Sequence, residues 1–176
     1  RLPIPASRDT TIRKAATAPD RHSFRKEQPM TDKQATQLII PPLGRLYARL
    51  DAPAETLLRV VAGIALVVHG LPKILDPLSN VGMVEGLGFY PGALWSPLLA
   101  ATEFFGGILL IVGLLTRPAA FATMIVLLVT VWFHWITLGQ GYSGAEKSIL
   151  WAAILLFFAI RGGNRHSLDA RIGREF

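Results

Sequence analysis

The sequence predicts an all-α integral membrane protein: a four-helix bundle with a long outer loop between the first and second spans. Three observations carry this prediction. First, 51% of the 176 residues are apolar and only 17% are charged, with a mean hydropathy of +0.41, whereas a soluble domain usually carries about 25% charged residues. Second, four long apolar stretches match the length that a helix needs to cross a ~30 Å hydrocarbon core. Third, Lys and Arg are concentrated in alternate connecting segments, as expected when they remain on one side of a membrane.

The N-terminal segment, residues 1–42, differs from the rest of the chain because it is polar and basic. It has no apolar core of signal-peptide length and too little apolar surface to support a fold of its own. We expect it to be an extension that is disordered or not native to the chain, and Met30 opens a plausible native start. The predicted membrane domain with its four spans is therefore 43–160, and 161–176 is predicted to be a basic cytoplasmic tail.

The first span is preceded by a short amphipathic stretch at 43–50, with three leucines and a tyrosine on one helical face and two arginines on the other. This pattern is typical of a helix lying in the membrane interface, although a linker with the same pattern is an open alternative. Asp51 is then predicted to cap the next helix, with Pro53 in its first turn. That helix, the first span, is expected to continue to about residue 75.

The second span is predicted to follow a long outer loop at 76–95, which is rich in Gly and Pro and contains three aromatic residues. Ser96 and Pro97 would then supply the helix cap and the first-turn proline. This span is expected to end near residue 115.

The third span is predicted at 117–138, with Thr116 as its cap and two tryptophans near its outer end, as in an aromatic belt. A short Gly-rich turn separates it from the fourth span, predicted at 145–160. The order of these segments gives four spans.

The orientation of the spans follows from the basic residues. Neither 76–95 nor 139–144, the two connections predicted to lie outside, contains Lys or Arg. Both termini are therefore expected in the cytoplasm of a bacterium, with the bundle in its inner (plasma) membrane. We expect the tail arginines to lie against anionic lipid. The basic residues on the cytoplasmic side are Lys33, Arg45, Arg49, Arg117, Arg161, Arg165, Arg171 and Arg174.

Ionisable residues from different spans are expected to share one layer of the bundle. At 1.5 Å per helical residue, His69, Glu103 and His134 all fall in the outer half of the membrane. Lys73 lies one helical turn above His69, and Glu146 would lie just above this layer. Because a lone carboxylate near the centre of a span costs about 3 kcal/mol or more, we expect Glu103 to face the bundle interior, where these residues supply partners. All five are candidate ligand-binding residues.

The four residues within this layer also have purely structural interpretations, which the sequence leaves open. Glu103 and Lys73 could form an ion pair with no further role. His69 could simply donate a hydrogen bond to a carbonyl, and His134, which lies between two tryptophans, could sit at the membrane interface.

Two other charged residues have alternatives of the same kind. Glu146 forms a capping-box pattern with Ser143, which would explain it without a ligand. Arg59, near the cytoplasmic end of the first span, could extend to lipid phosphates. Its alternative role is an interior polar contact that supports the bundle.

Several function classes are excluded or disfavoured by composition. The chain has no cysteine, which excludes disulfides, iron–sulfur clusters and Cys-ligated zinc, and we expect no metal site. A net charge of +6 and a pI near 10.2 could indicate nucleic-acid binding. We expect none, because the basic residues cluster beside apolar segments and do not alternate with stacking aromatics.

The membrane part of the chain, 57–160, resembles a DoxX-type membrane protein. The resemblance rests on "LLRVVAGIALVVHGLPKI" and "GFYPGALWSPLLAATEFFGGILLIVGLLTRPAA", followed by His134 and Glu146. Its best signals are Arg59, the His-Gly pair with its nearby lysine, and the Glu-x-x-Gly-Gly block that begins at Glu103. The family is a four-helix membrane bundle named from a small subunit of a thiosulfate:quinone oxidoreductase. Other members are associated with membrane redox and oxidative-stress systems.

The resemblance implies a membrane subunit close to quinone chemistry. A quinone carbonyl needs a proton donor when it is reduced, and a nearby carboxylate can relay the proton. His69, Lys73, Glu103 and His134 are side chains of the right types. Electrons would have to come from a partner redox protein or a bound cofactor, and whether the chain itself is catalytic stays open.

Two further interpretations remain open beside the quinone hypothesis. The chain could be a non-enzymatic bundle that binds a small hydrophobic ligand, or a scaffold that recruits a partner enzyme through its basic tail. A haem held between His69 and His134 is not expected, because the flanking residues do not demand one. The sequence is compatible with a homo-oligomer and does not fix the oligomeric state.

Overall fold

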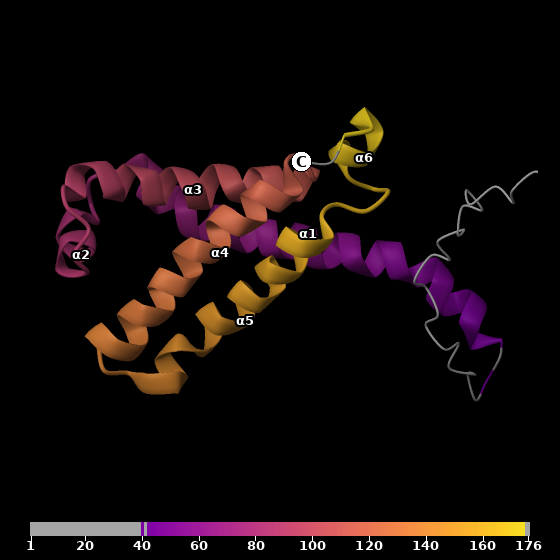
Figure 1. Ribbon diagram of the computed structural model, residues 1–176, viewed down its shortest axis with the longest axis horizontal. Coiled ribbons are helices and arrows are strands. Elements are labelled where there is room, and N and C mark those ends of the chain that lie inside the picture. The colour runs from indigo at the N-terminus through magenta and orange to yellow at the C-terminus, as the bar shows by residue number, and fades with distance from the viewer. Residues whose placement is uncertain (1–39, 41, 175–176) are drawn as a thin grey trace, which may run out of the picture. The chain divides into compact units, whose positions relative to one another are not determined.

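The computed structural model describes residue 40 and residues 42–174. All regular secondary structure in this part of the chain is helical. The N-terminal extension is expected at residues 1–42. Except for residues 40 and 42, it lies outside the described residues. Figure 1 shows the order of the elements. They are α1 (Leu43–Leu75), α2 (Val81–Gly86), α3 (Gly92–Val112), α4 (Thr116–Trp132), a π-helical turn η1 (Phe133–Thr137), α5 (Gly141–Arg161) and α6 (Leu168–Ile172).

Four helices are long and apolar enough to cross a membrane: α1, α3, α4 together with η1, and α5. Large apolar side chains project outward from all four, which is the arrangement that lipid favours and water does not. The predicted all-α membrane bundle is therefore confirmed. Examples of these exposed side chains are Leu57, Val68, Leu98, Phe105, Phe121, Leu128, Leu150 and Ile160.

The first span begins earlier than predicted, because α1 is one continuous helix of 33 residues. The predictions of a separate amphipathic helix and of a cap at Asp51 are wrong, since Asp51 and Pro53 both lie inside α1. A proline inside a helix removes one backbone donor and favours a bend, and the first turns of α1 bend away from the rest in Figure 1. Next to the proline, the Ala52 carbonyl accepts hydrogen bonds from the side chains of Thr56 and Asn164, both at 2.8 Å.

The helices pack in two close pairs, α1 with α3 and α4 with α5. Glycines bring α1 and α3 into backbone contact: a Cβ added to Gly63 would lie 2.7 Å from the Gly107 carbonyl oxygen, and the reverse substitution gives the same distance. Small residues are typical of such close helix contacts in membranes. The two pairs cross and then diverge toward the end that carries α2 and η1 (Figure 1). Where they meet, they bury Leu66, Leu110, Ala119, Ala120, Leu155 and Phe158.

The connection between α1 and α3, residues 76–91, contains the short helix α2. α3 begins at Gly92, one turn before the predicted cap at Ser96, so that prediction is wrong. The cap comes instead from α2, because a carboxylate oxygen of Glu85 accepts the Gly92 N–H at 2.9 Å. Ser96 is buried inside α3 and donates its hydroxyl hydrogen bond to the Pro77 carbonyl at 2.6 Å.

The starts of the last two spans also differ from the prediction. Thr116 is the first residue of α4 and does not cap it through its side chain. α5 begins at Gly141, so Ser143 lies inside the helix and cannot form a capping box with Glu146. In both cases the local sequence pattern was misleading, and for α4 the cap is supplied by Asp169, far along the chain.

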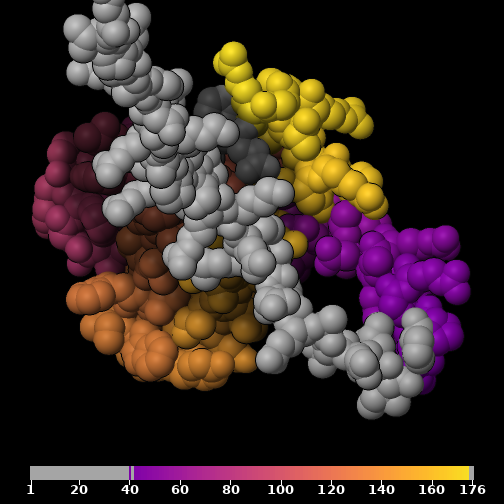
Figure 2. Space-filling view, turned by 45° about the vertical axis from the view of Figure 1, so that its right-hand side comes forward, coloured from indigo at the N-terminus to yellow at the C-terminus, as the bar shows by residue number. Residues whose placement is uncertain are grey.

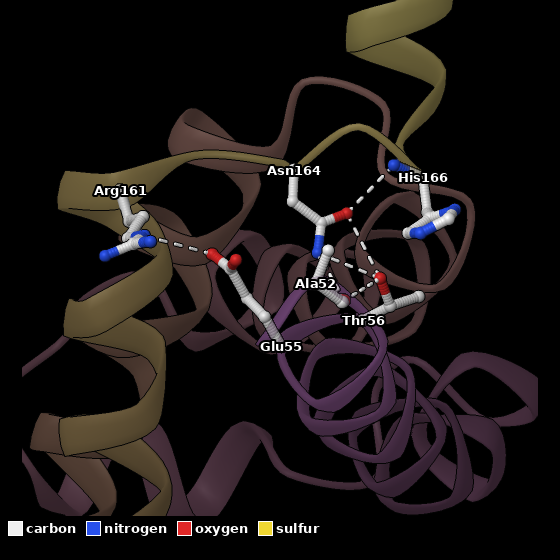
Figure 3. A network of polar contacts seen from close by, with 6 residues as sticks. All are labelled: Ala52, Glu55, Thr56, Arg161, Asn164 and His166. Atoms are coloured by element: carbon white, nitrogen blue, oxygen red, sulfur yellow. Dashed lines mark hydrogen bonds and ion pairs between the residues drawn. The ribbon is translucent and has the colours of Figure 1, made fainter. Parts of the chain in front are cut away.

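The segment predicted as a tail folds back onto the bundle. Its residues 162–174 lie beside the N-terminal part of α1, as the yellow and violet atoms in Figure 2 show. Asn164 is central to this contact: its amide donates to the Ala52 carbonyl at 2.8 Å and to the Thr56 hydroxyl at 2.9 Å (Figure 3). Arg161, which was expected against lipid, forms an ion pair with Glu55 at 3.3 Å.

Asp169 joins the same C-terminal segment to the turn between α3 and α4. Its carboxylate accepts the backbone N–H groups of Leu115 and Thr116 at 2.8 and 2.9 Å, and the Thr116 hydroxyl at 2.9 Å. Its own N–H donates to the Gly113 carbonyl at 2.9 Å. Since Asp169 is only 3% exposed, the C-terminal segment is an integral part of this end of the bundle.

Candidate ligand pocket

A pocket of about 360 Å³ opens between α1, α4 and α5, with Glu103 of α3 on its wall. This volume lies within the range of about 300–1,000 Å³ that is common for small-molecule sites. Apolar side chains form one part of its lining and polar or ionisable side chains the other. The lining residues are Ala62, Ala65, Leu66, His69, Lys73, Glu103, Leu127, Thr130, His134, Gly144, Lys147, Ser148, Trp151 and Leu155.

Lys73 and Glu103 form an ion pair across the pocket wall, with 2.6 Å between Nζ and Oε2. The side chain of Glu103 is 5% exposed and that of Lys73 is 27% exposed. Glu103 can lie inside the helix bundle because Lys73 supplies both an opposite charge and a strong hydrogen bond. The pair also leaves one Glu103 oxygen and the remaining Lys73 donors available at the pocket.

His134 lies at the start of η1, where the end of α4 widens into a π-helical turn. Its Nδ1 is 2.9 Å from the Thr130 carbonyl oxygen, a contact that requires a hydrogen on Nδ1. In the neutral ring Nε2 therefore carries the lone pair and can accept a hydrogen bond. A π-helical turn inside a membrane helix is often found at functional sites.

His69 lines the same pocket from α1, one turn before Lys73. Its side chain is exposed and makes no hydrogen bond or ion pair within the described part of the chain. The hydrogen bond to a carbonyl that was its structural alternative is thus not formed there. Both ring nitrogens are left for a ligand or for water.

The pocket face of α5 contains Lys147, a residue that the sequence interpretation did not select. Gly144, Lys147, Ser148, Trp151 and Leu155 all line the pocket, and their spacing of three and four residues places them on one helical face. The prediction began the fourth span at residue 145 and therefore treated its first residues as a helix end. The apolar-polar stripe at this spacing was the signal that could have identified Lys147.

Glu146 has a different position from the other predicted site residues. It is exposed and is not among the side chains that line the pocket. The pocket face of α5 begins at Gly144 and continues through Lys147 and Ser148, and Glu146 lies outside it.

Arg59 lies one helical turn before Ala62, the first α1 residue of the pocket lining, and does not line the pocket itself. It is 1% exposed, and its Nη1 donates to the Leu110 carbonyl at 2.9 Å. Nη2 is 3.5 Å from the His166 carbonyl, and the carboxylates of Glu55 and Asp169 act on it electrostatically. The structure therefore gives Arg59 the interior polar contact that was one of its two interpretations.

A second pocket, of about 250 Å³, is lined by α2, α3 and α4 and by the connection between α2 and α3. Thr102 is the one polar side chain on its wall besides the indole of Trp95, and no charged residue lines it. Within residues 40 and 42–174, no group of three or more His, Asp or Glu side chains is arranged to hold a metal ion. Of these two pockets, the first is the one at which ionisable side chains converge.

Comparison with known proteins places this arrangement in a family. The family model described as DoxX matches residues 54–135, which include Arg59, His69, Lys73, Glu103 and His134. An uncharacterized protein of Haemophilus influenzae is 31% identical in an alignment over 128 residues that covers 67% of this chain and 90% of that relative. No solved structure matches the chain. With its four membrane-crossing helices and this similarity over nearly all of a relative, the chain belongs to the DoxX family of membrane proteins.

Proposed function

We propose that the protein binds a quinone in the pocket between α1, α4 and α5 and serves as a membrane subunit of a quinone-linked redox system. The observation that carries this proposal is the convergence of His69, Lys73, Glu103 and His134 on one pocket of about 360 Å³. A quinone ring is apolar on its faces and polar at its two oxygens. The aliphatic part of the lining suits the ring faces, and the ionisable part suits the oxygens.

The side chains around the pocket can both donate protons to a quinone and accept protons from it. Neutral His134, with Nδ1 bound to the Thr130 carbonyl, can accept a proton or a hydrogen bond at Nε2. Lys73 can donate one to a quinone oxygen, and Glu103, 2.6 Å from Lys73, can return a proton to it. General acid–base groups in these positions are what reduction or oxidation of a quinone requires.

Electron transfer is assigned by this proposal to a partner protein. The chain has no cysteine, so it cannot hold a Cys-ligated iron–sulfur cluster. The quinone, when bound, supplies the electron acceptor or donor, and the residues of this chain supply binding and protons.

The proposal includes the bacterial inner membrane and a topology with both termini in the cytoplasm. Supporting it, Arg45, Arg117 and Arg174 belong to segments at one end of the bundle, while 76–91 and 138–140 contain no Lys or Arg. An excess of basic residues of this kind marks the cytoplasmic side. The pocket would then lie in the half of the membrane that faces away from the cytoplasm.

Cysteine labelling tests this topology cleanly, because the chain has no native cysteine. We expect Ser79→Cys, in the outer connection, to react with a membrane-impermeant maleimide in intact spheroplasts. Arg174→Cys should react only after the membrane is permeabilised, since it would lie on the other side. Both residues are exposed, so burial does not prevent labelling. The reverse pattern of labelling would mean that the orientation is inverted.

Binding of naphthoquinone to the detergent-purified protein tests the proposed function. We expect saturable binding by isothermal titration, and expect Ala65→Phe to weaken it at least tenfold, since the larger side chain would fill the pocket that Ala65 lines. Ala122→Phe is the matched control, because Ala122 lines the apolar pocket beside α3 and α4 and its substitution should leave the affinity unchanged. Mass spectrometry of the purified protein should also detect a membrane quinone that is depleted in Ala65→Phe.

The same measurements separate this proposal from its alternatives. Co-purification of another apolar molecule in the pocket, without any quinone binding, would indicate a non-redox ligand-binding bundle. If Ala122→Phe loses naphthoquinone binding while Ala65→Phe keeps it, the quinone binds in the apolar pocket. That result would contradict the roles given to Lys73, Glu103 and His134.

A further inference from the structure

The charges around the pocket do not balance. Lys73 and Lys147 are the cationic residues of its lining, and Glu103 is its one carboxylate. Because Glu103 is bound to Lys73, the ammonium group of Lys147 is left over. The charges of these two lysines and one carboxylate sum to one net positive charge.

Lys147 has no compensating group within the described part of the protein. It makes no hydrogen bond or ion pair there, and Glu146 beside it is not part of the pocket lining. An unpaired ammonium at the depth of a membrane helix is expensive, and such residues are usually found where they meet an opposite charge. Lys147 is exposed, and it lines the pocket six residues after the first residue of α5.

The neighbours of Lys147 on α5 are also suited to a negatively charged oxygen. Ser148 is buried and can donate through its hydroxyl, and Trp151 can donate through its indole N–H. Neither side chain makes a hydrogen bond within the described residues, and both line the pocket one turn or less from Lys147. One cation and two neutral donors therefore lie along a single face of α5.

We infer that the pocket selects a singly charged anionic ligand, the ionised form of an acidic hydroxyquinone, whose negative oxygen lies against Lys147. This inference rests on the proposed quinone-binding function and adds the charge state of the ligand to it. In an ionised hydroxyquinone the charge is shared between the former hydroxyl oxygen and a ring carbonyl oxygen, as in a carboxylate. Lys147, Ser148 and Trp151 face those oxygens, while the Lys73–Glu103 pair and His134 remain for the far side of the ring.

Two naphthoquinones that differ by one acidic hydroxyl test this inference. Lawsone, the hydroxylated compound, is ionised at neutral pH, whereas naphthoquinone is neutral. We expect the detergent-purified protein to bind lawsone about tenfold more tightly than naphthoquinone in isothermal titrations at neutral pH. Lys147→Met should abolish this preference by weakening the binding of lawsone, because the charge attracts only the anion.

Two control variants separate a local effect of Lys147 from a change in net charge. Lys147→Arg keeps the positive charge and should keep most of the preference. Arg165→Met removes an exposed charge at the other end of the bundle and should leave the preference unchanged. Equal affinities for the two compounds in the unmodified protein would overturn the inference and leave the quinone site intact. A preference for lawsone that survives Lys147→Met would do the same. If neither compound binds, the proposed function itself is wrong, and the inference fails with it.

Discussion

Replacing Asp169 by alanine is expected to lower the melting temperature of the detergent-purified protein by about 5–10 °C. The carboxylate accepts three hydrogen bonds at the start of α4, from the backbone of Leu115 and Thr116 and from the Thr116 hydroxyl. Losing a helix cap costs about 0.5–2 kcal/mol, and leaving buried donors without partners costs more. For a chain of this length each kcal/mol corresponds to about 2–4 °C.

The same substitution also removes a negative charge that acts on Arg59. Arg59 is buried, and its Nε has no hydrogen-bond partner within the described residues. Its charge is therefore stabilised by the Leu110 and His166 carbonyls and by nearby carboxylates. Taking away one of these carboxylates leaves the guanidinium less well compensated, which brings the expected total loss to about 2–4 kcal/mol.

Asp51→Ala is the matched control for this prediction. Asp51 is an exposed aspartate of α1, and exposed substitutions usually change stability by less than about 0.5 kcal/mol. Asp169→Asn should fall between the two, because the amide keeps one acceptor oxygen but loses the charge. If Asp169→Ala and Asp51→Ala melt at the same temperature, the C-terminal segment does not stabilise the bundle in the way described.

The spans themselves could be predicted because their signal is local. Hydropathy and helix length act within each stretch, so the number of membrane helices and their approximate ends follow from composition alone. The meeting of His69, Lys73, Glu103 and His134 at one pocket could be anticipated for the same reason, since equal depth in the membrane restricts where polar side chains can lie. Depth alone did not show which face of each helix they occupy.

The helix caps could not be predicted, because they come from residues distant in sequence. Asp169 caps α4 from a segment that follows α5, and Glu85 caps α3 from α2. Local patterns at Asp51, Ser96 and Thr116 were plausible caps by composition, but tertiary contacts decided where the helices begin. Hydropathy predicts a tail for the C-terminal segment for a related reason: its polar residues bind to other polar groups of the bundle, and hydropathy does not register such bonds.

The double variant Glu103→Gln with Lys73→Met is expected to be more stable than either single variant. Each single variant leaves one member of a 2.6 Å ion pair without its partner, and unpaired buried charges are strongly destabilising. Lys73→Met should have the larger effect of the two, about 3 kcal/mol, because Glu103 is 5% exposed while Lys73 is 27% exposed and can turn toward water. Removing both charges should recover about 1–3 kcal/mol as a coupling energy.

Naphthoquinone binding by the same variants then separates a structural role of the pair from a role in the site. If Glu103 and Lys73 serve the ligand, the double variant should fold well and still bind naphthoquinone at least tenfold more weakly than the unmodified protein. Glu146→Gln is the control, since Glu146 is exposed and outside the pocket lining, and it should change neither stability nor binding. A stable double variant that binds naphthoquinone with full affinity would show that Glu103 is a structural charge, held inside the bundle only to balance Lys73.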